Sequence, residues 1–399
     1  MKPFPELTFS FEWESLLLKE DLTIPDPREV REVANLIRSR VYGSEMGLDY
    51  IQRVGPMLEI RPGILRDAEE LSTRIEEHLR AIHKECEKRR LLFLPCGTHP
   101  ALGNAIGLHV HIGSIYDSRD AVRIANGLLK YSPCFAALAT NSPVYGDLVG
   151  EYKSYRLLFH AQFCSITRAL VSPRLAQWRW AEDISVKVDL HSTLELRIGD
   201  SASSRQFIEE YVLFVTAFFL SDWEEKLDEK GYEEYIINRW RASRYGLQAI
   251  FQWDGKETPV VELLKDMLKV SKFKTLKPGE LRLIPIMLEK RQTQADWQME
   301  IYRDISDPFA YTRLLIDLLK RGDPFMNYME GAGKLPLLKP ESIDKYILSH
   351  IHKDTPYTLL YELLLLPYAL LDRHLQSLIK SGKIRMQCDP RYGKRFTRV

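Results

Sequence analysis

Carboxylates and imidazoles recur at a spacing of two in the strand-like segments of this chain. Residues two apart on a strand point to the same face, while their neighbours point to the other. If the apolar faces pack on helices, the polar faces converge on one side of a single sheet. The segments and their polar residues are TFSFEWESLLL with Glu12 and Glu14, MLEIRPG with Glu59, GLHVHIGS with His109 and His111, and STLELRIGD with Glu195 and Arg197.

Grouped carboxylates of this kind need a cation. Burying ionised carboxylates together is costly unless positive charge neutralises them. Hard divalent cations prefer carboxylate oxygens, and Mg²⁺ usually keeps positions open for phosphate oxygens. The pattern therefore favours Mg²⁺ and a nucleotide, with arginines balancing the phosphate charge. The arginine candidates are Arg156, Arg197, Arg241 and Arg244.

Each motif also has a plainer interpretation when it is taken alone. EWE is most often a solvated strand face, and HVH is more often a structural or exposed pair than a pair of ligands. RWRASRYG is typical of a solvated basic helix face, and GTHP of a turn. The combination of these motifs in one order favours a shared site.

The bulk properties indicate a soluble, cytoplasmic protein. The chain has 399 residues, a formal net charge of +1 and 45% hydrophobic residues, which excludes a global bias toward nucleic acid or membrane. Its five cysteines are scattered without a CxxC pair, so we expect reduced thiols. The N-terminus lacks the apolar core of a signal peptide. The longest apolar run, YVLFVTAFFL, is about half a membrane span, and we expect a buried helix there.

The order of predicted elements divides the chain in two. Strands and helices alternate up to STLELRIGD, and helices dominate from Gln206 to Arg321. Gly and Pro cluster between Gly331 and Ser342, which predicts a linker. Three short helices and a two-stranded hairpin follow, the layout of a winged helix. We expect a first domain over residues 1–333 and a winged-helix-like domain over residues 340–399.

The series EWE, MLEI, GTHP, GLHVHIG, NSPVYG with YKSYR, TLELRIGD and NRWRASRYG resembles glutamate–cysteine ligase family 2. These proteins are also called carboxylate–amine ligases. The resemblance runs in order from about Thr8 to about Gly246 and more weakly to about Arg321. TLELRIGD and RWRASRYG are its most specific segments, whereas HVHIG is shared more broadly with glutamine synthetases.

The resemblance implies an α+β fold with a glutamine-synthetase-like antiparallel sheet, lined by metal-binding carboxylates and backed by helices. It also implies an ATP-dependent ligase using Mg²⁺, or Mn²⁺, that phosphorylates the γ-carboxylate of glutamate or a related acid. An amine then attacks the acyl phosphate. Ligases of this fold commonly form homodimers, and no membrane partner is expected.

Carried over to this sequence, the resemblance implies roles for individual residues. Metal ligands are Glu12, Glu14, Glu59, His109 and Glu195, and the phosphoryl or acid contacts are Arg156 and Arg197. Nucleotide contacts are His111, Asn238, Arg241 and Arg244. Tyr152, Ser154 and Lys187 are expected on the substrate side.

The sequence departs from the family pattern near substrate recognition. Trp13 stands where the family has the middle member of an acidic triplet, and by alternation it faces away from Glu12 and Glu14. The helical insert usual between GTHP and GLHVHIG is missing, and with it part of the wall expected around the amine substrate. DISVK replaces the family's Asp-Ile-Arg-Pro, and Lys187 is a candidate for the missing arginine.

The C-terminal extension leaves three hypotheses open. The first is a ligase making a γ-glutamyl-type amide. The second is a metabolite-sensing regulator whose basic winged helix binds DNA, since Arg385, Arg391, Lys394, Arg395 and Arg398 suit a phosphate backbone. In the third, the winged helix holds a protein or peptide substrate.

Overall fold

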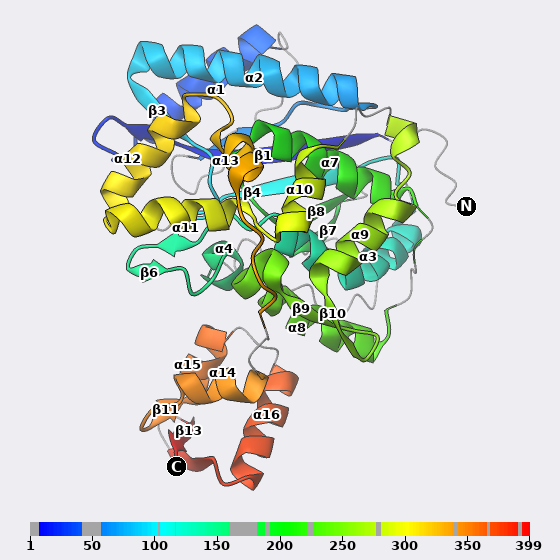
Figure 1. Ribbon diagram of the computed structural model, residues 1–399, viewed down its shortest axis with the longest axis vertical. Helices are drawn as coiled ribbons and strands as arrows, with labels where there is room; N and C mark the ends of the chain where they lie inside the picture. Colours follow the sequence, from blue (N-terminus) through cyan, green and yellow to red (C-terminus); the bar gives the residue numbers. More distant parts are fainter. Residues whose placement is uncertain are drawn as a thin grey trace. The chain divides into compact units, whose positions relative to one another are not determined.

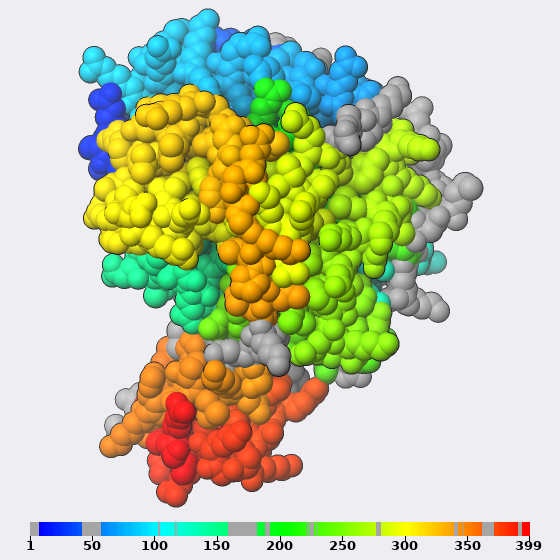
Figure 2. Space-filling model, viewed as in Figure 1, coloured from blue at the N-terminus to red at the C-terminus, as the bar shows by residue number. Residues whose placement is uncertain are grey.

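The computed structural model describes residues 8–41, 57–102, 104–115, 117–159, 182–187, 192–221, 223, 227–276, 281–338, 342–364, 368–389 and 393–399. They form two compact units, Met1–Leu338 and Lys339–Val399, which Figures 1 and 2 show in colours that follow the sequence. Each unit is described by itself below.

The first unit is built on a six-stranded antiparallel sheet with the order β2-β1-β4-β8-β7, in which β3 also pairs with β1. Its long strand β1 takes three partners in turn: β4 near its start, β2 in its middle and β3 at its end. The strands are β1 (Phe9–Lys19), β2 (Met57–Ile60), β3 (Leu91–Leu94), β4 (Gly107–Ile112), β7 (Ile184–Lys187) and β8 (Thr193–Asp200).

Helices surround this sheet (Figure 1). The aromatic rings of Phe135 on α3 and of Tyr211, Phe214 and Phe218 on α7 pack together with centroids 5.3–6.2 Å apart. The run YVLFVTAFFL lies in α7 up to Phe219, and this part is buried as its composition predicts. The helices are α1 (Pro27–Val41), α2 (Ala68–Arg89), α3 (Ser118–Leu138), α4 (Tyr155–Phe159), α7 (Arg205–Phe219), α8 (Glu229–Tyr245), α9 (Val260–Val270), α10 (Leu283–Lys290), α11 (Gln294–Ile305), α12 (Pro308–Leu319) and α13 (Pro324–Gly331).

The prediction of mixed helices and an antiparallel sheet is confirmed. Of the segment YRLLFHAQFCSITRALV, where we expect a helix from its apolar spacing, only α4 is described, and the remainder lies outside the described residues. A small hairpin, β5 (Val144–Tyr145) and β6 (Leu148–Val149), turns at the end of the NSPVYGD segment.

A second hairpin breaks the helical stretch predicted from Gln206 to Arg321. Strands β9 (Ile250–Trp253) and β10 (Lys256–Pro259) pair across Asp254 and Gly255, both with positive φ. An Asp-Gly pair is a strong hairpin signal because both turn residues must adopt that conformation. Helical propensity around it concealed the turn.

The second unit contains α14 (Ile343–His350), α15 (Tyr357–Leu364) and α16 (Tyr368–Lys380). Its small sheet has the order β11-β13-β12, formed by β11 (Thr355–Pro356), β12 (Ile384–Asp389) and β13 (Gly393–Arg398). Ile347, Leu375 and Phe396 are among its buried side chains, so this unit has an apolar core of its own.

Among the described residues, no helix is both long and apolar enough to cross a membrane. The described cysteines Cys86, Cys96, Cys134 and Cys388 are free.

The GTHP motif forms a buried loop that His99 closes. Its Nδ1 atom accepts hydrogen bonds from the backbone N–H groups of Ala101 and Leu102, both at 3.1 Å. His99 is fully buried, and this burial lowers its pKa to about 4. The neutral ring is therefore a structural acceptor that protonation would disable.

We expect the free energy of unfolding to fall on acidification partly because of His99. Its folded pKa lies below the unfolded value near 6.5, so only the unfolded chain binds the proton between these values. Stability is thus lost as the pH falls below about 6.5 and levels off near pH 4, amounting to about 2 kcal/mol between pH 7 and pH 5. His99→Asn keeps an acceptor oxygen but does not titrate. Urea unfolding at both pH values should show a smaller loss in the variant, and equal losses would contradict this role.

Candidate functional site

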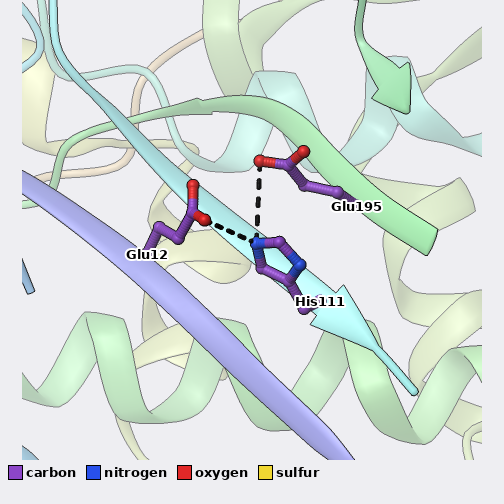
Figure 3. Close-up of side chains that lie close together, drawn as sticks. All are labelled: Glu12, His111 and Glu195. Atoms are coloured by element: carbon purple, nitrogen blue, oxygen red, sulfur yellow. Dashed lines mark ion pairs between the residues drawn. The ribbon is translucent and has the colours of Figure 1, made fainter. Parts of the chain in front are cut away.

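Three neighbouring strands bring Glu12, His111 and Glu195 together (Figure 3). The Nε2 atom of His111 lies 3.1 Å from Oε1 of Glu12 and 3.6 Å from Oε1 of Glu195. All three side chains are buried. The strand register explains the meeting, because His111 on β4 lies directly opposite Glu195 on β8.

His109 extends this cluster along β4. It lies opposite Glu12 in the β1–β4 register. Its Nδ1 atom is 3.1 Å from Oε2 of Glu12 and 3.3 Å from Oε1 of Glu195. Both imidazoles predicted from the HVH spacing thus contact the same two carboxylates.

Glu14 and Glu59 form the adjoining part of the same face. They lie opposite each other in the β1–β2 register, and both are buried. The backbone N–H of Gly107 donates to Oε2 of Glu14 at 2.5 Å. Arg61 forms an ion pair with Glu59 and places its Nη2 atom 3.1 Å from Oε1 of Glu12. Sequence reasoning predicted the two carboxylates but not this arginine.

The surroundings shift the pKa values of these acids in opposite directions. Burial, reinforced by the charge of Glu12, holds the pKa of Glu59 well above its ordinary value. Burial also opposes ionisation of Glu12 and Glu195. For Glu12, His111, His109 and Arg61 outweigh burial and lower the pKa. For Glu195, burial is outweighed by Arg197, together with His111 and Lys187, and the pKa is again lowered.

Two cationic side chains, one on β8 and one on β7, contact Glu195. Nη1 of Arg197 lies 2.5 Å from Oε1 of Glu195, two residues away on β8. Nζ of Lys187 on β7 lies 2.6 Å from the other oxygen, Oε2. The predicted arginine and the predicted lysine therefore both lie on the carboxylate face.

Arg156 comes from α4, outside the sheet. Its Nη2 atom donates to the backbone carbonyl of Arg197 at 3.0 Å and lies 3.4 Å from Nε2 of His109. It is 2% exposed, so its guanidinium is held inside the protein. Its Nη1 atom lies 3.9 Å from a carboxylate oxygen of Asp200.

Asp200 ties the segments around Arg156 together. Its carboxylate accepts hydrogen bonds from the hydroxyls of Ser142 and Ser154, at 2.6 and 2.8 Å, and from the backbone N–H of Asn141 at 2.8 Å. Ser154, predicted on the substrate side, thus has its hydroxyl engaged by this carboxylate. Because Ser154 directly precedes α4, its hydrogen bond to Asp200 fixes the start of that helix.

The residues predicted to contact a nucleotide on α8 lie beside the β9–β10 hairpin. Asn238 exchanges two hydrogen bonds with the backbone of Gln252, and Nη1 of Arg241 donates to the carbonyl of Ile250 at 2.9 Å. Arg244 lies over the ring of Tyr152, 5.4 Å from its centroid. These side chains therefore connect α8 to its neighbours, and their nucleotide roles stay predictions.

Sequence reasoning missed three charged residues of this region. Arg61 follows Glu59 by two residues, so the same alternation that selected Arg197 could have found it. Asp200 ends the TLELRIGD motif, yet spacing alone does not reveal its partners. Arg239 pairs with the buried Asp183 through Nε at 2.5 Å and Nη2 at 2.9 Å, a contact between distant segments.

The donor set fits a divalent cation. One potential ligand atom each from Glu12, His111 and Glu195 lies within 4.8 Å of the other two. Carboxylate oxygens suit Mg²⁺ and Mn²⁺, and an imidazole shifts the preference toward Mn²⁺ and other transition metals. The neighbouring arginines could contact anionic oxygens of a second ligand.

Comparison with known proteins confirms the predicted resemblance. Residues 102–180 match the family described as Glutamate-cysteine ligase family 2 (GCS2). The chain is 26% identical over 244 residues to a protein of Gloeobacter violaceus named "Putative glutamate--cysteine ligase 2", a match covering 48% of this chain and 64% of that protein. It is 30% identical over 190 residues to "Putative glutamate--cysteine ligase 2-1" of Arthrobacter sp., covering 41% and 48%. The chain thus spans less than two thirds of either relative.

A solved structure covers more of the chain at lower similarity. It is the complex between the prokaryotic ubiquitin-like protein Pup and its ligase PafA, with 13% sequence identity and a TM-score of 0.49. The match covers 99% of this chain and 88% of that one.

We expect Gly107→Ala to disrupt the site. An added Cβ would lie 2.4 Å from Nη2 of Arg156 and 2.6 Å from Nε2 of His109, and both side chains are too buried to move freely. The free energy of unfolding of the variant should be about 2 kcal/mol lower than that of the wild type. Chemical denaturation measures this loss.

Gly331→Ala is the matched control, since its added Cβ meets no atom of the described residues within 4 Å. It should change stability by less than about 1 kcal/mol. Equal effects of the two substitutions would contradict the close approach of Arg156 and His109 to β4.

Proposed function

We propose that this protein is an ATP-dependent carboxylate–amine ligase that uses Mg²⁺ or Mn²⁺. The convergence of Glu12, His111 and Glu195 on one sheet face is the observation that carries the proposal. The match to glutamate–cysteine ligase family 2 supports it independently. We further propose that the sheet is glutamine-synthetase-like and that the first unit is the catalytic domain.

In this proposal Glu12, Glu14, Glu59, His109 and Glu195 hold the metal, and His111 contacts the nucleotide phosphates or joins the ligand set. The observed distances between His111 and the carboxylates allow either role. A bound divalent cation would supply positive charge to neutralise and orient phosphate oxygens. Arg61 and Lys187 contact the carboxylates from the periphery and limit the repulsion among them.

Arg156 and Arg197 are proposed to stabilise the negative charge of phosphoryl transfer. The γ-phosphoryl group of ATP moves to a carboxylate oxygen of the acid, and ADP leaves. The amine then attacks the acyl carbon, phosphate leaves with the C–O bond pair, and the nitrogen loses a proton. Such chemistry relies on positioning and fixed charge rather than on a protein nucleophile. The buried guanidinium of Arg156, held by backbone and side-chain contacts, is suited to it.

The names of the relatives support glutamate, or a related acid, as the acid substrate. The amine is left open by the proposal. Tyr152, Ser154 and Lys187 remain proposed substrate-side residues, and Asn238, Arg241 and Arg244 remain proposed nucleotide-side residues.

The role of the second unit stays a prediction from the sequence. Three helices and a small sheet are consistent with the predicted winged helix, and Arg385, Lys394 and Arg398 are exposed on its strands. Binding of DNA, or of a protein or peptide, by this unit stays a prediction, as do a homodimer and a cytoplasmic location. The match to a ligase family favours the ligase over the regulator.

We expect Glu12→Gln and Glu195→Gln to lower metal-dependent turnover by at least about 100-fold, because each removes a charged oxygen from the proposed metal site. ADP release is measured with Mg²⁺, ATP, glutamate and a panel of amines. Titration calorimetry with Mn²⁺ in the absence of ATP gives a second readout, and both variants should bind the ion more weakly.

Glu262→Gln provides the control, because Glu262 is an exposed carboxylate on α9 and should leave both readouts unchanged. ADP release that never depends on an acid and an amine together would overturn the ligase. Wild-type Mn²⁺ affinity in both site variants would overturn the metal assignment.

A further inference from the structure

A cavity of about 600 Å³ lies against the part of β1 and β3 where Trp13 packs on Phe93. Its other walls come from α2 and from the end of α12, which Figure 2 shows side by side in light blue and yellow. Because Trp13 alternates with Glu12 and Glu14, this cavity belongs to the other face of the sheet from the carboxylates. It is therefore separate from the site described above.

The cavity combines an apolar wall with charged side chains of both signs. Leu79, Leu319 and Phe93 supply apolar surface, and Glu20 and Glu87 supply carboxylates. The cations are Arg90, Arg205 and Lys320, of which Arg205 is paired with Glu209 at 2.8 Å. Lys320 has a carboxylate neighbour, since its Nζ atom is 3.5 Å from Asp317. Arg90 is exposed, and its side chain has no hydrogen-bond or ion-pair partner within the described ranges.

Arg90 also occupies an unusual backbone position. It caps the C-terminus of α2 in the left-handed conformation, with φ of 55°. Glycine is the residue that fits this position without strain. An arginine there, beside a cavity and without a partner among the described residues, suggests that its charge serves a ligand.

Trp13 adds a second unsatisfied group in the cavity wall. The side chain is 2% exposed, and its indole Nε1–H has no hydrogen-bond partner among the described residues. A buried donor of this kind is unfavourable unless an acceptor reaches it. A ligand with an acceptor group beside Trp13 could satisfy it after a small rotation of the ring.

We propose that this cavity binds a small amphipathic anion, with an aromatic or branched apolar body and one carboxylate or sulfonate group. The volume is within the range of small-molecule sites. The apolar body would lie against Phe93, Leu79 and Leu319, and the anionic group would face Arg90. Charge complementarity at Arg90 distinguishes this ligand class from neutral apolar compounds.

The test uses two fluorescent probes that differ by one charge. 1-Anilinonaphthalene-8-sulfonate carries the sulfonate, and N-phenyl-1-naphthylamine is its neutral counterpart. The wild type should bind one equivalent of the sulfonate and prefer it over the neutral probe. Arg90→Gly removes the cation and relaxes the backbone, so it should weaken sulfonate binding about fivefold, as expected for a solvent-exposed ion pair. Binding of the neutral probe should not change.

Arg291→Gly is the matched control. Arg291 caps α10 in the same left-handed conformation, with φ of 58°, but does not line the cavity. It should leave sulfonate binding unchanged. Leu79→Trp narrows the cavity and should weaken binding of both probes.

Sulfonate affinity that is equal in the wild type and Arg90→Gly would overturn the anionic class. Affinity that Leu79→Trp leaves unchanged would place the probe elsewhere and overturn the site. If Leu79→Trp does not fold, the comparison of Arg90→Gly with Arg291→Gly decides alone. None of these readouts depends on ligase activity.

Discussion

The arrangement of charged residues in the first unit depends on the repulsion among the carboxylates buried on one face of the sheet. Glu12, Glu14, Glu59 and Glu195 are all 5% exposed or less, so water does not screen their charges. Arg61, Lys187 and Arg197 contact these carboxylates and offset part of the repulsion. A set of acids retained at such cost is typical of a functional site.

The register of the antiparallel sheet determines which of these charged side chains contact one another. A shift of one residue between β1 and β4 would move Glu12 away from His109 and place Glu14 on the wrong face. Apolar residues on the opposite face, including Phe11 and Trp13, prevent that shift because they would lose their buried environment. Packing behind the sheet therefore fixes the positions of the charged groups in front of it.

Alternation and motif resemblance were enough to predict much of this arrangement. They predicted the strands, the helices that cover them and the meeting of Glu12, Glu195 and the two imidazoles. The β9–β10 hairpin was not predicted, because its Asp-Gly turn lies between strongly helical segments. The partners of Asp200 and the pairing of Arg239 with Asp183 depend on distant loops meeting in space, which no local spacing encodes.

Trp13 connects the two sides of the sheet. On one side its neighbours Glu12 and Glu14 belong to the carboxylate cluster, and on the other its ring lines the cavity of about 600 Å³. Trp13 is the residue that breaks the acidic pattern of β1, and alternation places it on the opposite face from Glu12 and Glu14. An apolar side chain can be buried there, whereas a carboxylate would be out of reach of the arginines and the lysine of the carboxylate face. The departure of Trp13 from the family pattern is therefore compatible with the proposed metal site, and it gives this chain a feature behind the sheet that the resemblance alone would not predict.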